Sequence, residues 1–342
     1  MAKKAHDYDA LPTGTYAPHW LQEMRVVMVV LAFVLLLELI ARIIAPILDY
    51  DRVNIFAFPD TIQKLAQTAE KSGNPKVVFF GNSLMMHGLD QDLVKTQLKS
   101  RSDQEIESAK ITPVGTAMLD WVFLYQRYFS DTKSHPDVMV VGFVAHHIHD
   151  QEPIKLRRLS RHFVAKKALP QLWDTDLDYD FHNVPQSVLC NISALGGDQP
   201  EHQLGILQTL IADYRVGLNR NNGLVSDWKQ RMAQEAAKKK GEELGSGTQQ
   251  ETYQRMLRFI TECKKHGVKL YFVPMPQPDV WDFNPEAQKI IEAEGMTVLD
   301  ARRIPGMTEE DFSDGYHLGE TGKEKFSQWM AEQLSTQLKQ AD

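Results

Sequence analysis

Cysteine is scarce in this sequence: the 342 residues include only two, Cys190 and Cys263. Two cysteines are too few for a disulfide framework, and their spacing is not that of metal ligands. Basic residues are not in excess either, because 38 Lys and Arg stand against 45 Asp and Glu and leave a formal net charge of −7. This balance gives no support to nucleic-acid binding, so we expect no nucleic-acid partner. The remaining composition, 43% hydrophobic and 24% charged, is that of a folded protein with one or two domains.

Long hydrophobic runs are also rare, with one exception near the N-terminus. Residues 26–48 contain only two charged side chains, Glu38 and Arg42. A helix of this length spans about 34 Å, enough to cross the hydrocarbon core of a bilayer. The two charges are four residues apart, so they can pair on one helix face and lower each other's cost. We therefore expect residues 25–48 to be a single transmembrane anchor.

A buried core helix and a cleaved signal peptide are the alternatives to an anchor. The signal peptide is disfavoured, because 25 residues precede the apolar run and no small-residue cleavage site follows it. The orientation rests on a weak bias of basic residues before and after the run: Lys3, Lys4 and Arg25 against Arg52 and Lys64. This bias favours a cytoplasmic arm over residues 1–24 and an extracytoplasmic (periplasmic) domain on the inner, or cytoplasmic, membrane. Residues 49–75 then form a linker.

Short apolar runs recur in the rest of the chain, with helical stretches between them. They cover residues 77–80, 111–114, 138–142, 268–273 and 296–299. Runs rich in Val, Ile and Phe without strict alternation suit parallel strands that are buried on both faces. With intervening helices they predict an α/β fold, a doubly wound (flavodoxin-like) parallel sheet of about five strands over residues 76–342.

A mostly helical insertion is expected at residues 151–248, because this stretch contains no clear strand. Connections of such length are usually functional or separately structured. The insertion begins with a basic run, residues 155–167, which we interpret as a solvated helix face. Close to a membrane this face could contact lipid phosphates or an anionic glycan.

The first apolar run ends abruptly in Gly81-Asn82-Ser83. Ser83 could simply cap a helix, since serine is a favoured cap. It could also be a nucleophile, because ligands of α/β sheets bind beyond the carboxyl ends of the strands. A serine nucleophile needs a base, and the base needs an orienting partner. Asp314 and His317 stand three apart near the C-terminus, so the carboxylate can accept from Nδ1–H and leave Nε2 to face a serine.

Histidines cluster after the third apolar run, at His146, His147 and His149, followed by Asp150. His147 and His149 would share one face of an extended chain, as a pair of metal ligands could. We favour a local polar cluster at a strand end over a metal site. No metal and no other cofactor is therefore expected.

Four segments, in order along residues 76–340, resemble the SGNH, or GDSL-type, hydrolase superfamily. They are Gly81-Asn82-Ser83, Pro113-Val114-Gly115-Thr116-Ala117, the Pro136-Asp137-led run that ends at Gly142, and Asp314-Gly315-Tyr316-His317-Leu318. The resemblance implies that Ser83 is the nucleophile, His317 the base and Asp314 its orienter. It also implies that the backbone N–H groups of Ser83 and Gly115 form part of an oxyanion hole.

Two positions depart from the pattern of that superfamily. Asn82 stands where the first block has an aspartate. In the superfamily, the third of these segments is followed by an asparagine that contributes to the oxyanion hole. Residues 142–150 of this sequence contain no asparagine. An imidazole N–H from His146 or His147 is predicted to donate in its place.

Anchored members of this superfamily often modify cell-surface polymers beside a multi-span membrane acyltransferase. The sequence is similar in architecture to proteins of alginate O-acetylation and of D-alanyl transfer to teichoic acid. The resemblance implies an extracytoplasmic O-acyltransferase or esterase that acts on a glycan or polymer through an acyl-serine intermediate. The implied partners are the bilayer, an acylated donor, a polymer acceptor and a multi-span acyltransferase. A plain carboxylesterase and a catalytically degenerate scaffold are the alternatives.

Overall fold

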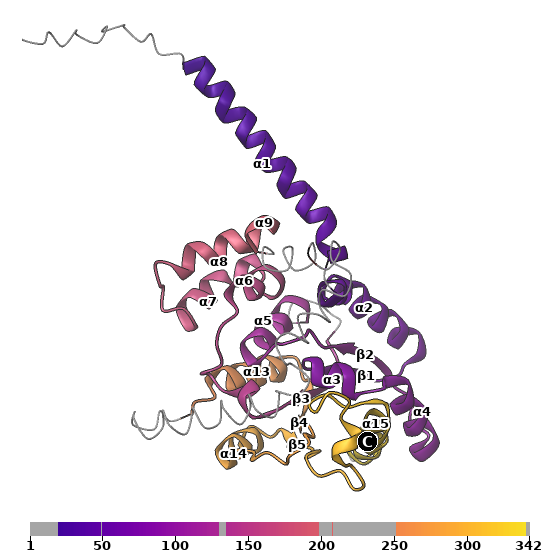
Figure 1. Ribbon diagram of the computed structural model, residues 1–342. Helices are drawn as coiled ribbons and strands as arrows, with labels where there is room; N and C mark the ends of the chain where they lie inside the picture. The colour runs from indigo at the N-terminus through magenta and orange to yellow at the C-terminus, as the bar shows by residue number, and fades with distance from the viewer. Residues whose placement is uncertain (1–19, 49, 130–134, 198–206, 208–250, 340–342) are drawn as a thin grey trace, which may run out of the picture.

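A five-stranded parallel sheet forms the centre of the protein (Figure 1). The computed structural model describes residues 20–48, 50–129, 135–197, 207 and 251–339. The strands, in chain order, are β1 (Lys76–Phe80), β2 (Glu107–Ile111), β3 (Val138–Phe143), β4 (Lys269–Pro274) and β5 (Thr297–Val298). They are arranged as β2-β1-β3-β4-β5, the order of a flavodoxin-like sheet. The predicted α/β class is therefore confirmed.

The strands that the apolar runs predicted well are the fully buried ones. Every residue of β3 is buried, as are all but the first residue of β1, so these strands show no alternation of apolar and polar residues. The sequence predicted that residues 111–114 end the second strand, and β2 ends at Ile111, at the start of that run. β2 pairs with β1 only and is an edge strand, and its polar side chains at Glu107, Ser108 and Lys110 hide it from an apolar criterion.

Helices cover both faces of the sheet. On one face α5 (Met118–Tyr128), α13 (Gln254–Lys265) and α14 (Pro285–Ala293) contribute to one hydrophobic core. On the other face α3 (Ser83–Gly88), α4 (Gln91–Ser102) and α15 (Glu320–Lys339) contribute to a second core. The loops that leave the carboxyl ends of the strands therefore meet between two rigid layers.

The expected linker, residues 49–75, is largely a helix of the domain. α2 (Tyr50–Ser72) occupies almost all of this range. Its buried apolar side chains follow helical spacing and pack into the first core: Ile55, Phe58, Ile62 and Leu65. Pro59 inside the helix and the flanking polar residues obscured this pattern.

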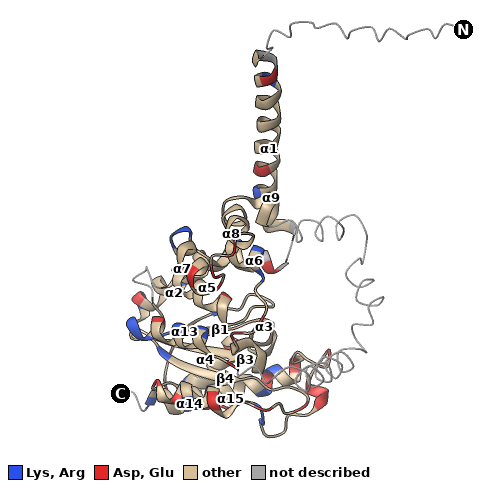
Figure 2. Ribbon diagram, turned by 90° about the vertical axis from the view of Figure 1, so that its left-hand side faces the viewer, with Lys and Arg blue, Asp and Glu red and all other residues tan. Residues whose placement is uncertain are grey.

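One helix near the N-terminus, α1 (Trp20–Leu48), extends away from the domain as a rod. Its segment Glu23–Ile47 is long and apolar enough to cross a membrane, and only 6% of its most apolar window is buried. A signal sequence meets the same criteria. Figure 2 shows that the acidic and basic residues of α1 lie toward its two ends.

Within the described residues of the insertion, the regular secondary structure is helical, with turns and coil between the helices. Its elements are α6 (Leu156–Arg158), η2 (Leu159–Phe163), η3 (Lys166–Ala168), α7 (Leu169–Thr175), α8 (Asn183–Ile192) and α9 (Ala194–Gly197). Residues 198–206 and 208–248, the rest of the predicted insertion, lie outside the described residues. Cys190 in α8 and Cys263 in α13 are both buried and are not joined by a disulfide.

Candidate active site

The turn that delivers Ser83 depends on a glycine. Gly81 follows β1 with φ +153°, and a Cβ there would lie 2.8 Å from the carbonyl oxygen of Gly142 at the end of β3. Only glycine permits so close an approach of two backbones. Asn82 then caps α3 by accepting a hydrogen bond from the backbone N–H of Leu84 (3.0 Å). Ser83 thus opens α3 between β1 and β3, the point of the sheet where the strand order reverses.

The structure brings Ser83, His317 and Asp314 together in one line of contacts. His317 Nε2 lies 2.9 Å from Ser83 Oγ, and His317 Nδ1 lies 2.8 Å from Asp314 Oδ2. The second carboxylate oxygen of Asp314 accepts from the backbone N–H groups of Tyr316 (2.9 Å) and His317 (2.6 Å). Asp314 therefore fixes both the turn and the imidazole, and Nε2 is placed to accept the serine proton.

The charge of Asp314 suits this arrangement. Burial pushes the pKa of its carboxyl upward, but the hydrogen bonds from the backbone and the ring of His317 outweigh burial and hold the pKa below its usual value. The group is consequently a carboxylate at neutral pH. A carboxylate keeps the proton of His317 on Nδ1 and stabilises an imidazolium after proton transfer.

A buried aspartate pins the loop that carries Asp314 and His317. Asp311 accepts from Lys325 Nζ (2.8 Å) and from the backbone N–H of Thr308 (2.7 Å). Its carbonyl oxygen accepts from the backbone N–H of Gly319 (2.7 Å). Both ends of the loop are therefore fixed to η4 (Glu309–Asp311) and α15.

Two aromatic rings contact the imidazole ring of His317. The ring of His87, four residues after Ser83 in α3, meets it edge to face at 5.1 Å between centroids, and that of Tyr316 does so at 4.9 Å. Burial, with the neighbouring His317 next in importance, lowers the pKa of His87, so this ring is neutral at pH 7. His87 can pack on the His317 imidazole without a competing charge.

The loop that carries Gly115, the predicted oxyanion donor, is held by charged side chains from distant segments. Gly115 adopts φ +63°, and its carbonyl oxygen accepts from Lys155 Nζ (2.6 Å). The backbone N–H of Val114 donates to Asp51 Oδ1 (2.8 Å), while Arg158 donates to the Val114 carbonyl and pairs with the Asp51 carboxylate. Lys155 and Arg158 belong to the run that the sequence assigned to a solvated face. Lys155 is exposed as expected, but Arg158 is half-buried, and for Arg158 that interpretation is wrong. Nothing in the local sequence indicates the contacts, because the partners come from other parts of the chain.

His147 lies next to the turn that carries Ser83 and is 7% exposed. Its Nδ1 accepts from the backbone N–H of Val144 (3.1 Å), so the proton of the neutral ring is on Nε2. Burial, followed by the charge of His146, lowers its pKa well below the usual value. The side-chain nitrogen of Asn82 lies 3.1 Å from Nε2 and 3.2 Å from Nδ1; being a donor, it can bond only to the unprotonated Nδ1, and it donates to the Thr116 carbonyl (3.1 Å). Asn82 and His147 thus tie the first and third blocks together, and a role for His146 or His147 in the oxyanion hole stays a prediction.

The neighbouring His149 and Asp150 serve contacts that the sequence did not indicate. Asp150 accepts from the backbone N–H groups of Gln254 (2.7 Å) and Arg255 (2.9 Å) at the start of α13. His149 Nε2 lies 3.6 Å from Glu251 Oε2. Within the described ranges, no group of three or more His, Cys, Asp or Glu residues is arranged to hold a metal ion.

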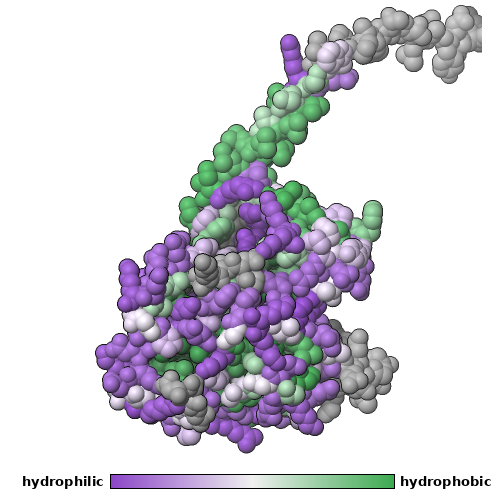
Figure 3. Space-filling model, turned by 180° about the vertical axis from the view of Figure 1, so that it is seen from behind, coloured by the Kyte–Doolittle hydropathy of each residue, from purple (hydrophilic) through white to green (hydrophobic). Residues whose placement is uncertain are grey.

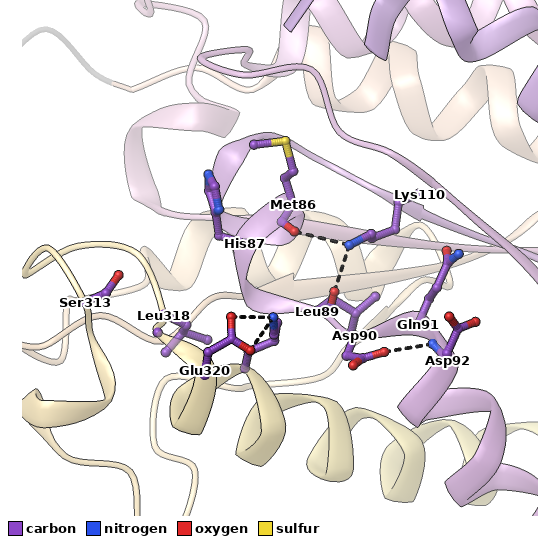
Figure 4. A pocket seen from close by; sticks show the side chains of 12 residues that line it. Met86, His87, Leu89, Asp90, Gln91, Asp92, Lys110, Ser313, Leu318 and Glu320 are labelled. Atoms are coloured by element: carbon purple, nitrogen blue, oxygen red, sulfur yellow. Dashed lines mark hydrogen bonds and ion pairs between the residues drawn. The ribbon is translucent and has the colours of Figure 1, made fainter. Parts of the chain in front are cut away.

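A polar pocket of about 510 Å³ opens on the His87 side of the triad (Figure 4). Charged side chains from three elements reach its wall, among them Asp90 and Asp92, Lys110, and Glu320 with Lys323. Lys110 donates to the carbonyl oxygens of Met86 (3.2 Å) and Leu89 (2.9 Å), and burial lowers its pKa. The pocket therefore offers hydrogen-bonding groups of both signs rather than an apolar wall.

Comparison with known proteins gives likeness in structure alone. No protein-family model and no curated protein matches the chain. A protein from Desulfitobacterium hafniense DCB-2 assigned to the G-D-S-L lipolytic family covers 76% of this chain and 99% of its own length, with 10% identity and a TM-score of 0.34. The lipase Lip_vut3 from a goat rumen metagenome covers 76% and 97%, with 11% identity and a TM-score of 0.30. At such identities the reaction has to be inferred from this chain's own residues.

Proposed function

We propose that the protein is a serine-dependent ester hydrolase or O-acyltransferase. The observation that supports this most is the unbroken relay from Asp314 through His317 to Ser83, with contacts of 2.8 and 2.9 Å. Both distances are within the reach that general-base catalysis requires. A degenerate scaffold would have no need of this alignment.

The relay supports a two-step reaction. His317 Nε2 takes the proton of Ser83 as Oγ attacks the ester carbonyl, and backbone N–H groups, including that of Gly115, receive the developing oxyanion. When the ester C–O bond breaks, the leaving alkoxide takes the proton from Nε2 and an acyl-serine remains. Water or an acceptor hydroxyl then gives its proton to His317 Nε2 and attacks the acyl carbon; the bond from the acyl carbon to Oγ breaks, and Ser83 Oγ takes the proton back from Nε2.

The pocket beside His87 favours transfer to a polar acceptor as the second candidate function. Its wall is charged and hydrogen-bonding, which suits a hydroxyl-rich molecule better than a long acyl chain. We therefore propose a cell-surface glycan or polymer as the acceptor, with a plain carboxylesterase as the competing reaction. The proposed setting is the inner membrane, with α1 as a single-pass anchor, the domain outside the cytoplasm and a multi-span acyltransferase as partner.

The deciding experiment uses the full chain in detergent with a fluorophosphonate probe. Wild type should be labelled at Ser83, the Ser83→Ala variant should not, and a Ser193→Ala control should be labelled like wild type. Absence of labelling in the folded wild-type protein would leave the scaffold as the correct interpretation. Product analysis with a short acyl ester and added oligosaccharide then separates acylated sugar from free acid, and a C-terminal compartment-specific reporter tests the orientation.

A further inference from the structure

Helix α8 of the insertion has its polar side inward. Ser187 and Asn191 are buried on the side that faces the domain. Ser187 Oγ accepts from Trp173 Nε1 (2.8 Å), and Asn191 Nδ2 donates to the carbonyl oxygens of Ser160 (2.7 Å) and Val164 (2.9 Å). A surface helix in water usually shows the reverse arrangement, with its apolar side toward the core.

The outward side of the same segment is apolar. Leu189, Ile192 and Leu195 follow one another at intervals of three residues across the junction of α8 and α9. They are 54%, 49% and 37% exposed. We call these three side chains the apolar stripe. Figure 3 shows hydrophobic surface on the domain beside the base of the α1 rod, which is itself hydrophobic over most of its length.

Two of the charged residues of α1, Glu38 and Arg42, bind the backbone of this junction. Glu38 accepts from Ser193 Oγ (2.8 Å) and from the backbone N–H groups of Ala194 (2.8 Å) and Leu195 (3.1 Å). Arg42 pairs with Glu38 (2.8 Å) and donates to the carbonyl oxygen of Ile192. We call this set of contacts the clasp.

The clasp satisfies the groups that a helix end would otherwise leave unpaired. The first N–H groups and the last C=O groups of a helix have no partner within the helix, and in hydrocarbon each unpaired group costs several kcal/mol. Close approach is possible because the side chains of α1 at this level are small: Ala41 and Ala45 are 3% and 0% exposed. Glu38 and Arg42, which are charged residues within an apolar span, therefore have a structural role.

The level of the clasp along α1 indicates what covers the apolar stripe. Glu23–Ile47 is 25 residues long, about 37 Å as a helix, which exceeds a hydrocarbon core of about 30 Å by little more than one turn. Glu38 precedes Ile47 by about 14 Å at 1.5 Å per residue. A bilayer spanned by α1 therefore reaches the α8–α9 junction or lies directly against it.

We propose that the α8–α9 segment is a second membrane-embedded element, whose apolar stripe inserts into the domain-side leaflet of the bilayer that α1 spans. This inference rests on the proposed membrane anchor. A single helix would leave the domain free to swivel about its base. The second attachment fixes the orientation of the domain and the height of Ser83 above the membrane.

Fluorescence in lipid nanodiscs tests the insertion. A single cysteine carrying an environment-sensitive dye is placed at Ile192, at Leu35 in mid-α1 or at the exposed Val280 of the domain, in a chain with Cys190→Ala and Cys263→Ala. At positions 192 and 35 we expect a blue-shifted emission, strong quenching by doxyl-labelled lipid and protection from aqueous iodide. At position 280 we expect the reverse.

The possible outcomes separate the two proposals. Lipid quenching at 35 together with iodide quenching at 192 would overturn the insertion and leave the anchor standing. Protection of position 192 from both quenchers would mean that protein covers the apolar stripe, and this result would also overturn the insertion. Iodide quenching at both positions would overturn the anchor and the insertion together. As a matched pair, Glu38→Gln should expose position 192 to iodide while position 35 stays in lipid, and Glu23→Gln should change neither.

Discussion

Arg158 pairs with Asp51, which precedes it by 107 positions, and both side chains hold the backbone of Val114 next to Gly115. Asp51 stands in the first turn of α2, close in the chain to the end of α1, and Arg158 belongs to the insertion. The predicted oxyanion loop is thus tied to α2, which follows the proposed anchor α1, and to α6 of the insertion, which also contains the α8–α9 segment.

The first prediction concerns this ion pair. Arg158→Gln or Asp51→Asn should loosen the loop and lower kcat by up to about 10²-fold, since small misplacements of catalytic groups can cost that much. The double variant should lose no more than either single variant, because both remove one shared interaction. Neutralising the exposed Lys99, which pairs with Glu105, is the matched control and should leave kcat unchanged. If the Lys99 control changes KM and kcat as much as the Arg158 and Asp51 variants do, the pair has no special role at the loop.

The second prediction separates the roles within the triad. Ser83→Ala and His317→Ala should abolish labelling and turnover. Asp314→Asn should lower kcat on the order of 10⁴-fold, because the neutral amide no longer holds the imidazole in the required tautomer. For each variant, thermal unfolding measures the effect on stability and steady-state kinetics measures the effect on turnover. Full activity of folded Asp314→Asn would assign the orienting role to another group.

Much of this fold follows from short-range patterns, and the site follows from them only in part. Fully buried strands such as β1 and β3 appear as apolar runs, whereas the half-buried edge strand β2 does not. Ser83, Asp314 and His317 stand in recognisable local motifs. Asp51 and Arg158 do not, because a contact between distant segments depends on how α2 and the insertion pack, which no local pattern encodes. The polar inner side of α8 is a further example, since its partners are the Trp173 indole and the backbone carbonyls of Ser160 and Val164.

The third prediction concerns stability against pH at Asp311. Burial favours the neutral acid, but Lys325 and the N–H of Thr308 outweigh it and hold the pKa of Asp311 below its usual value. A lowered pKa stabilises the fold above the unfolded value of about 3.9, and this contribution is lost as pH falls through the folded value. Asp311→Asn should therefore cost about 1–3 kcal/mol at pH 7 and progressively less below pH 4. Denaturant unfolding at several pH values measures it, with the exposed Asp60→Asn as control, and a pH-independent difference would contradict the assignment.

The last prediction concerns the missing asparagine of the third block. His147 is the better candidate for the oxyanion donor, because its Nδ1 is occupied by Val144 and its proton is on Nε2, next to the turn that carries Ser83. His147→Ala should lower kcat on the order of 10²-fold, the loss expected for one donor. His147→Asn should recover part of it, since an amide also donates. Because the ring is buried and contacts Asn82, His147→Ala should also lower the unfolding free energy by about 1–3 kcal/mol, so kcat is measured per probe-labelled site. His146→Ala is the matched control with little loss. If both alanine variants keep full turnover per labelled site, backbone groups alone form the hole, and if His146→Ala alone loses activity, the donor is the other imidazole.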